Sequence, residues 1–134
     1  MLMLQVLFDF PSLPQPDVSP LMRDVARAME TSVLLNFTQQ RNPDGVPWIP
    51  SKRAQRDGGK TLIDKGGLLT SVTAQSGADF AEVGFVHGDL PRWLHFGVPQ
   101  NNLPARNILG FRHEDEAKIV RLTAQYFETL FQVA

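Results

Sequence analysis

The placement of the prolines is the feature that most limits what this chain can fold into. They gather mainly in three connectors: PSLPQP at 11–16, QQRNPDGVPWIPSKRAQRDGGKT at 39–61 and VPQNNLPARN at 98–107. Proline lacks a backbone N–H and clashes inside a helix, so long regular elements must lie between these stretches. The segment 39–61 is expected to be a long, irregular and mobile loop, because structureless loops of this length are commonly functional or mobile.

Two windows outside the connectors carry helical periodicity. In the first, Ser19 is a good N-cap and Pro20 suits the first helical position, so a helix should begin there and end near Phe37 or Thr38. Its apolar positions, which keep a period of about 3.6, are Leu21, Val25, Met29 and Val33. The second helix is expected over 113–131, with acidic residues in its first turn, where the helix dipole favours them. Its apolar stripe is Ile119, Leu122, Tyr126 and Leu130, with Phe127 beside it.

Shorter windows predict strands. The apolar stretch 2–10 is expected to be a buried strand. LLTSVTAQ at 68–75 can run from a helical turn into a strand, and FAEVGFVH at 80–87 alternates as its hairpin partner. PRWLHFG at 91–97 is a short helix or turn that ends at its glycine. The prediction is an α+β domain in which an antiparallel β-sheet packs against two long α-helices, with a long loop after the first helix.

Composition excludes several classes of protein. The 134 residues are expected to form a single domain, 1–134, with one core. A formal charge of −1 gives no field for general attraction to nucleic acid or membrane. The absence of cysteine excludes disulfide scaffolds and thiolate sites. The apolar start MLMLQVLFDF lacks the flanks of a signal peptide and is too short to span a bilayer, so we expect folding in the cytosol and no membrane partner.

The stretch AQRDGGKT, Ala54–Thr61, matches the loose form of a phosphate-binding loop, with Gly59, Lys60 and Thr61 in the expected order. Such a loop needs a buried strand before it and a helix after it, because the helix N-terminus completes the anion site. Here prolines precede the motif, and only a few residues separate it from Gly66 and Gly67. A nucleotide-binding protein is therefore kept only as a minor alternative.

Other chemical sites find no better support. The histidines His87, His95 and His113 lie on three expected elements without the spacing of metal ligands. The acidic residues are scattered, and Ser71 lacks the glycines of a nucleophile elbow. We therefore expect no catalytic residues, no metal and no cofactor, and a protein that is not an enzyme.

Four separated segments of the chain contain residue patterns that are harder to explain as generic loops. The segments are NPDGVPWIP at 42–50, KGGLLTSV at 65–72, WLHFG at 93–97 and LPARNILGF at 103–111. Their order and spacing resemble the phage virion morphogenesis family, small tail-completion proteins of tailed bacteriophages and prophages. The matching residues are Gly45, Pro47, Trp48, Gly66, Leu68, Ser71, His95, Phe96, Gly97, Pro104, Ala105, Arg106, Leu109 and Gly110.

The resemblance implies a structural assembly factor that completes the phage tail or neck, as a tail terminator or head–tail joining component. It implies identical subunits in a ring, a hexamer by analogy with relatives, on the end of a tail tube. The partners would be the protein itself and tail tube or neck proteins, and DNA would be contacted only as it passes through the ring. The protein would be assembled in the host bacterial cytoplasm and reside in the virion.

Individual residues keep two interpretations each. Trp48 either staples its loop to the core or anchors an interface. Gly66, Gly97 and Gly110 mark unusual backbone angles or close approach. Arg106 either holds a carboxylate or the last carbonyls of a helix, or pairs with a neighbouring subunit.

The basic stretch 52–65 has a local balance of +3 and is either a solvated loop or a contact arm. Its cations are Lys52, Arg53, Arg56, Lys60 and Lys65, against Asp57 and Asp64. An acidic tube rim or passing DNA would both suit such an arm, and the net charge favours a protein partner. A head-side neck connector or a host-repurposed binding module remains the alternative function, which the gene neighbourhood would discriminate.

Overall fold

The computed structural model describes residues 2–7, 16–63, 67–86 and 88–132. In chain order the elements are β1 (Leu2–Leu7), α1 (Ser19–Gln39), α2 (Lys52–Asp57), α3 (Gly67–Thr70), β2 (Val72–Ser76), β3 (Phe80–Phe85), α4 (Leu90–Phe96), the 3-10 turn η1 (Pro99–Asn101) and α5 (His113–Gln132). The predicted α+β class is confirmed. No helix within these ranges combines the length and apolar character needed to cross a bilayer.

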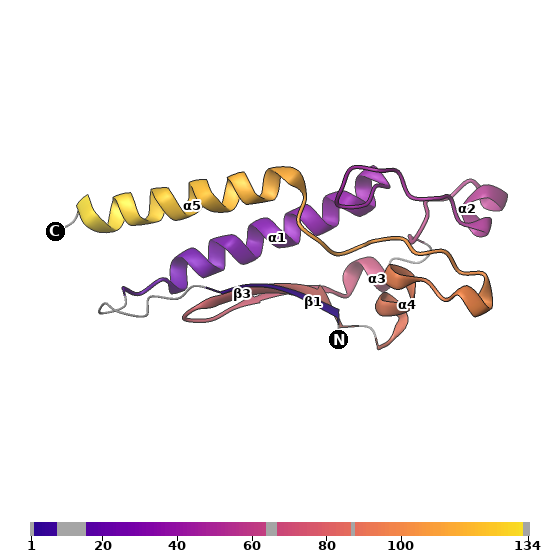
Figure 1. The fold of residues 1–134 in the computed structure, drawn as a ribbon, viewed down its shortest axis with the longest axis horizontal. Helices are drawn as coiled ribbons and strands as arrows, with labels where there is room; N and C mark the ends of the chain where they lie inside the picture. Colours follow the sequence, from indigo (N-terminus) through magenta and orange to yellow (C-terminus); the bar gives the residue numbers. More distant parts are fainter. Residues whose placement is uncertain (1, 8–15, 64–66, 87, 133–134) are drawn as a thin grey trace.

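The sheet of the described residues has three antiparallel strands in the order β1-β3-β2. The predicted hairpin is confirmed as β2 and β3, and β1 pairs with the other edge of β3. On the inner face, Val83 lies between Leu4 of β1 and Ala74 of β2. Helix α1 covers this face, and α5 runs along the far side of α1, which gives the layered arrangement seen in Figure 1.

The core lies between α1 and the sheet. Helix α1 buries Leu21, Met22, Val25, Ala26, Met29, Val33 and Phe37, which confirms the predicted apolar stripe. These side chains meet Ala81, Val83 and Phe85 of β3, and Ile108 from the connector before α5. Each large buried side chain stabilises the fold by roughly 1.5–3 kcal/mol. Burial in this central layer therefore stabilises the fold that carries the surrounding loops.

The start of α1 differs from the prediction. The helix begins at Ser19, so the cap position falls on Val18, which has no side-chain cap. Instead the Asp17 carboxylate accepts a hydrogen bond from the Ser19 N–H at 3.0 Å, and this bond lowers the pKa of Asp17. The helix ends at Gln39, one or two residues beyond the expected position, with Gln40 in the left-handed conformation.

A polar row crosses the outer face of the sheet. Glu82 of β3 is buried, and its carboxylate accepts hydrogen bonds from the side-chain amides of Gln5 on β1, at 2.9 Å, and Gln75 on β2. The register places these three residues opposite one another. Two donors from the flanking strands thus satisfy a carboxylate that no helix covers.

A second polar link joins the two long helices. The Ser32 hydroxyl of α1 donates to the Asp115 carboxylate of α5 at 2.7 Å, and both side chains are buried. The same carboxylate oxygen accepts the Arg112 backbone N–H at 2.7 Å and so caps the start of α5. One of the acidic residues predicted in the first turn of α5, Asp115, therefore fixes the position of this helix on α1.

Candidate functional site

The predicted motif segments meet at one end of the fold, where α4 and the connector before α5 lie beside the loop that follows α1 (Figure 1). Trp48 is only 6% exposed, and its ring packs edge-on against Phe37, with centroids 5.3 Å apart. Its indole N–H donates to the Asn107 carbonyl at 2.9 Å. Trp48 is therefore a core staple, the first of its two predicted interpretations. Gly45 and Pro47 form the turn that leads to it.

His95 and Gly97 fix the end of α4 against this connector. The Nδ1 atom of His95 accepts the backbone N–H of Ile108 at 3.1 Å and of Leu109 at 3.4 Å. Burial lowers the pKa of His95, which favours the neutral ring that can accept these bonds. Gly97 has φ 76° and ψ 168°, and a Cβ there would lie 2.7 Å from the Ala105 nitrogen. The predicted requirement for glycine at 97 is confirmed.

Arg106 is 6% exposed and its Nε donates to the Ile49 carbonyl at 2.7 Å. Its own backbone N–H donates to the Leu94 carbonyl at 2.9 Å, so one residue ties together the loop after α1 and helix α4. Burial lowers the pKa of the guanidinium. The carbonyl belongs to a loop and not to a helix end, which corrects the predicted partner. Pro104 and Ala105 precede it beside Gly97.

The remaining motif residues have local roles. Leu68 is buried in α3, and the Ser71 hydroxyl donates back to the Leu68 carbonyl at 2.7 Å, which closes the turn into β2. Gly110 is closely packed, because a Cβ there would lie 3.1 Å from the Pro43 side chain. Gly66 lies outside the described residues. Phe96 is 64% exposed and is thus the one residue of this set with a large free apolar surface.

The segment 39–61 was predicted to be irregular over its whole length. This prediction is wrong in part, because the segment contains helix α2. The Ser51 hydroxyl caps this helix by accepting the Ala54 N–H at 3.1 Å, and its own N–H donates to the Thr61 hydroxyl at 3.1 Å. Thr61 in turn exchanges two hydrogen bonds with the Gln40 side chain. Arg53 donates to the Lys60 carbonyl at 2.7 Å, so it braces the segment from within. Local hydrogen bonds therefore hold both ends of α2.

This geometry opposes the phosphate-loop hypothesis. Residues Ala54 to Asp57 are the last turn of a helix, and Gly58 caps its C-terminus in the left-handed conformation. A phosphate site needs the opposite order, in which glycines lead into a helix N-terminus. Thr61 is 3% exposed and its hydroxyl is already hydrogen-bonded, so it is not placed to hold a metal ion. Within the described ranges, no three potential metal-ligating side chains lie together.

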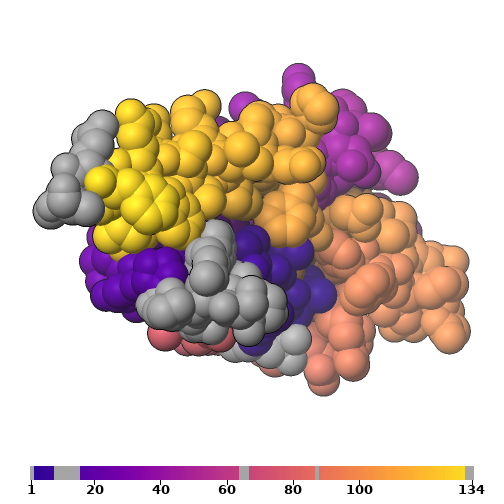
Figure 2. All heavy atoms as spheres, turned by 60° about the vertical axis from the view of Figure 1, so that its left-hand side comes forward, coloured from indigo at the N-terminus to yellow at the C-terminus, as the bar shows by residue number. Residues whose placement is uncertain are grey.

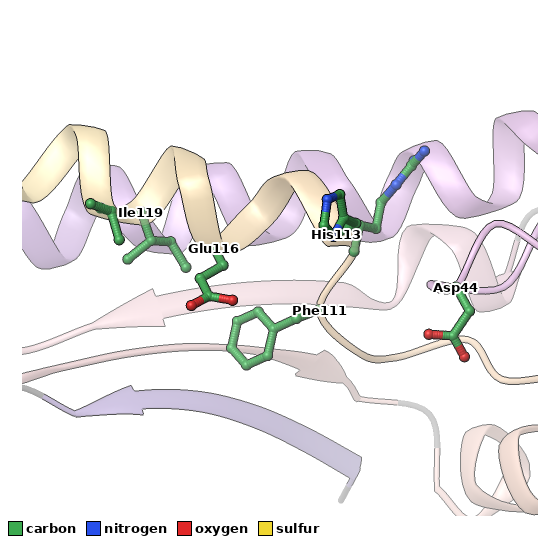
Figure 3. A pocket seen from close by; sticks show the side chains of 7 residues that line it. Asp44, Phe111, His113, Glu116 and Ile119 are labelled. Carbon is green, nitrogen blue, oxygen red and sulfur yellow. The ribbon is translucent and has the colours of Figure 1, made fainter.

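A groove of about 530 Å³ lies at the start of α5, and no sequence pattern predicted it. Ile119, Glu116 and His113 project from the helix, Phe111 comes from the connector and Asp44 from the loop after α1, as Figure 3 shows. Its lining also includes Val120 and Arg112. The groove combines apolar side chains with two carboxylates, and two of its lining residues, Asp44 and Phe111, come from the motif segments 42–50 and 103–111.

Comparison with known proteins identifies the family. A family model described as the phage virion morphogenesis family matches residues 3–128, which is most of the chain. No curated protein and no solved structure gave a match. The chain belongs to the phage virion morphogenesis family, and the resemblance inferred from its motifs is confirmed.

Proposed function

We propose that this member of the phage virion morphogenesis family completes the tail or neck of a phage particle by self-association, without catalysis. The observation that carries the proposal is the apolar surface left exposed where the family motifs meet. Leu90, Trp93 and Phe96 follow one side of α4, and the two aromatic side chains are 49% and 64% exposed. In Figure 2 this region (orange) projects from the body on the side opposite the end of α5 (yellow).

The motif residues support an association role because most of them position surfaces. Trp48, His95 and Arg106 use their polar atoms to hold three loops together. The side chains that remain free beside them are apolar: Val46 is 56% exposed and Ile49 is 60% exposed. Exposed aromatic and aliphatic clusters of this kind mark protein–protein contacts, in which tryptophan is a frequent energetic centre.

The proposed assembly is a closed ring of identical subunits, with a heterologous interface repeated by rotational symmetry. A hexamer is favoured by analogy with the family. The ring would sit on the end of the tail tube as a terminator, and DNA would be contacted only as it passes through the centre. The virion would then be the site of action.

The test uses tail tubes that lack this protein, imaged by negative stain after addition of the purified full chain. A ring of density at one end of each tube is expected, and Phe96→Ser should reduce occupancy because it removes the exposed aromatic surface. Leu35→Ser, on the exposed side of α1, is the matched control and should leave occupancy unchanged. Binding to DNA-filled heads but not to tubes would favour a head-side connector, and binding to neither would refute the proposal.

A further inference from the structure

The groove at the start of α5 has the chemistry of a socket for a basic, apolar segment. Its floor is Phe111, Ile119 and Val120, of which Val120 is 62% exposed. Asp44 and Glu116 supply negative charge at its rim, and neither carboxylate has a hydrogen bond or ion pair with any described residue. These two carboxylates are therefore available to an incoming cation.

Two basic side chains line the groove together with these carboxylates. Arg112 pairs with Glu114, with Nε 3.0 Å from the carboxylate oxygen, and also donates to the Gln39 side chain at 2.8 Å. Two of its three side-chain nitrogens are thus engaged by Glu114 and Gln39, and the third, Nη1, is buried without a hydrogen-bond partner among the described residues. The other basic side chain in the lining is His113.

A complementary surface lies at the α2 end of the same molecule. Ile49 is 60% exposed, and Lys52 and Arg56 follow it on one side of α2, because residues four apart lie on the same helix face. Arg56 pairs only with its neighbour Asp57, at 3.0 Å in an exposed position, and such pairs are weak. We call Ile49, Lys52 and Arg56 the basic arm.

The basic arm cannot fill the groove of its own chain. Hydrogen bonds from Ser51 to Thr61 and from Thr61 to Gln40 hold α2 in place. Figure 1 shows α2 at the end of the molecule, away from the first turn of α5, and the groove lining contains no residue of the arm. An arm and a socket on separate surfaces of one chain join one copy to the next in a head-to-tail sequence.

We propose that the basic arm of one copy docks in the α5 groove of the next copy, as a subunit contact of the ring. This inference rests on the proposed self-association. Ile49 would contact the apolar floor, Lys52 would pair with Glu116 and Arg56 with Asp44. The contact is heterologous, so its repetition closes a ring when the rotation between copies permits.

Charge reversal tests the contact. Lys52→Glu and Glu116→Lys each place like charges in the interface, and each should weaken self-association of the full chain at least about tenfold, as measured by sedimentation. Glu128→Lys makes the same charge change on the exposed side of α5 outside the groove, and it should assemble as the wild type does. An equal loss in Glu128→Lys would make net charge the cause and overturn the proposed contact.

Mixing the two charge-reversed variants, Lys52→Glu and Glu116→Lys, is the decisive experiment. Each junction between unlike chains then joins opposite charges, so the equimolar mixture should regain assembly and form rings with an even number of subunits. A mixture that stays dissociated, or single variants that assemble normally, would overturn this contact while leaving self-association intact. A wild-type chain that never associates would instead refute the proposed function, and the proposed contact with it.

Discussion

Replacement of Gly97 by alanine should disrupt the region where the family motifs meet. The backbone angles of Gly97, φ 76° and ψ 168°, lie in a region that other residues reach only with strain of about 1–3 kcal/mol. The added methyl group would also lie 2.7 Å from the Ala105 nitrogen and 2.9 Å from the Leu103 oxygen. Such overlap with backbone atoms costs about another 1–3 kcal/mol.

The sum of these two costs is about 4 kcal/mol, a large part of the roughly 5–15 kcal/mol that stabilises a domain. For a chain of this length the melting temperature should fall by about 10–20 °C, measured by circular dichroism or calorimetry. Gly67→Ala is the matched control, because a Cβ there meets nothing within 4 Å and the residue begins helix α3. It should leave stability unchanged or raise it by up to about 1 kcal/mol.

The reasoning would be refuted by a Gly97→Ala variant that melts within about 4 °C of the wild type, or by an equal loss in Gly67→Ala. The first result would mean that the connector moves away from Gly97 at little cost. The second would mean that any added methyl group destabilises this chain, whatever its surroundings.

Three further predictions follow from the buried polar contacts. Trp48→Phe removes the N–H that donates to the Asn107 carbonyl and should lower the free energy of unfolding in urea by about 1 kcal/mol. Trp48→Ala also removes the packing against Phe37 and should lower it by about 3–5 kcal/mol. Equal losses in the two variants would contradict the packing described for the indole ring. Asp115→Ala removes the acceptor of the Ser32 hydroxyl and the cap of α5, and should lower the free energy of unfolding by about 2–4 kcal/mol. In a double-mutant cycle it should couple strongly to Ser32→Ala, and additive losses of stability would argue against the hydrogen bond. Burial lowers the pKa of His95 below its ordinary 6.5, so the unfolded chain binds the proton more tightly than the folded chain. As the pH drops below about 6.5, the free energy of unfolding of the wild type should therefore fall relative to that of His95→Asn, whereas above this pH the two should change in parallel. Profiles that stay parallel over the whole pH range would refute this.

The local elements could be predicted where one segment determines its own structure. The apolar stripe of α1 and the hairpin of β2 and β3 follow from periodicity and turn residues, and both are confirmed. The end of α4 at Gly97 is also confirmed. Helix α2 was missed because prolines dominate the composition around it, although Ser51 before a run of good helix formers is an N-cap signal.

The contacts between distant segments could not be predicted from the sequence. Gln5 and Glu82 are 77 positions apart, and only the pairing of β1 with β3 brings them together. The groove joins Asp44 to residues of α5 in the same way. Because periodicity describes a segment and not its partner, it gives no information on such juxtapositions.

The motif residues were predicted as a set, and the structure brings Trp48, His95, Gly97 and Arg106 together. Family resemblance does not separate residues that hold an interface in place from residues that form it. Burial and hydrogen bonding distinguish the two kinds of position: Trp48 and Arg106 are buried and hold loops together, whereas Phe96 and Lys52 are exposed and are the residues proposed to take part in association.

The mass of the full chain in solution, measured by sedimentation over a wide range of concentrations with and without tail tubes, tests the central claim most directly. The account predicts a concentration-dependent shift from the 15.0 kDa monomer to one closed species of defined subunit number, which tail tubes should capture. A chain that sediments as a monomer at every concentration, and that tail tubes never recruit, would contradict it.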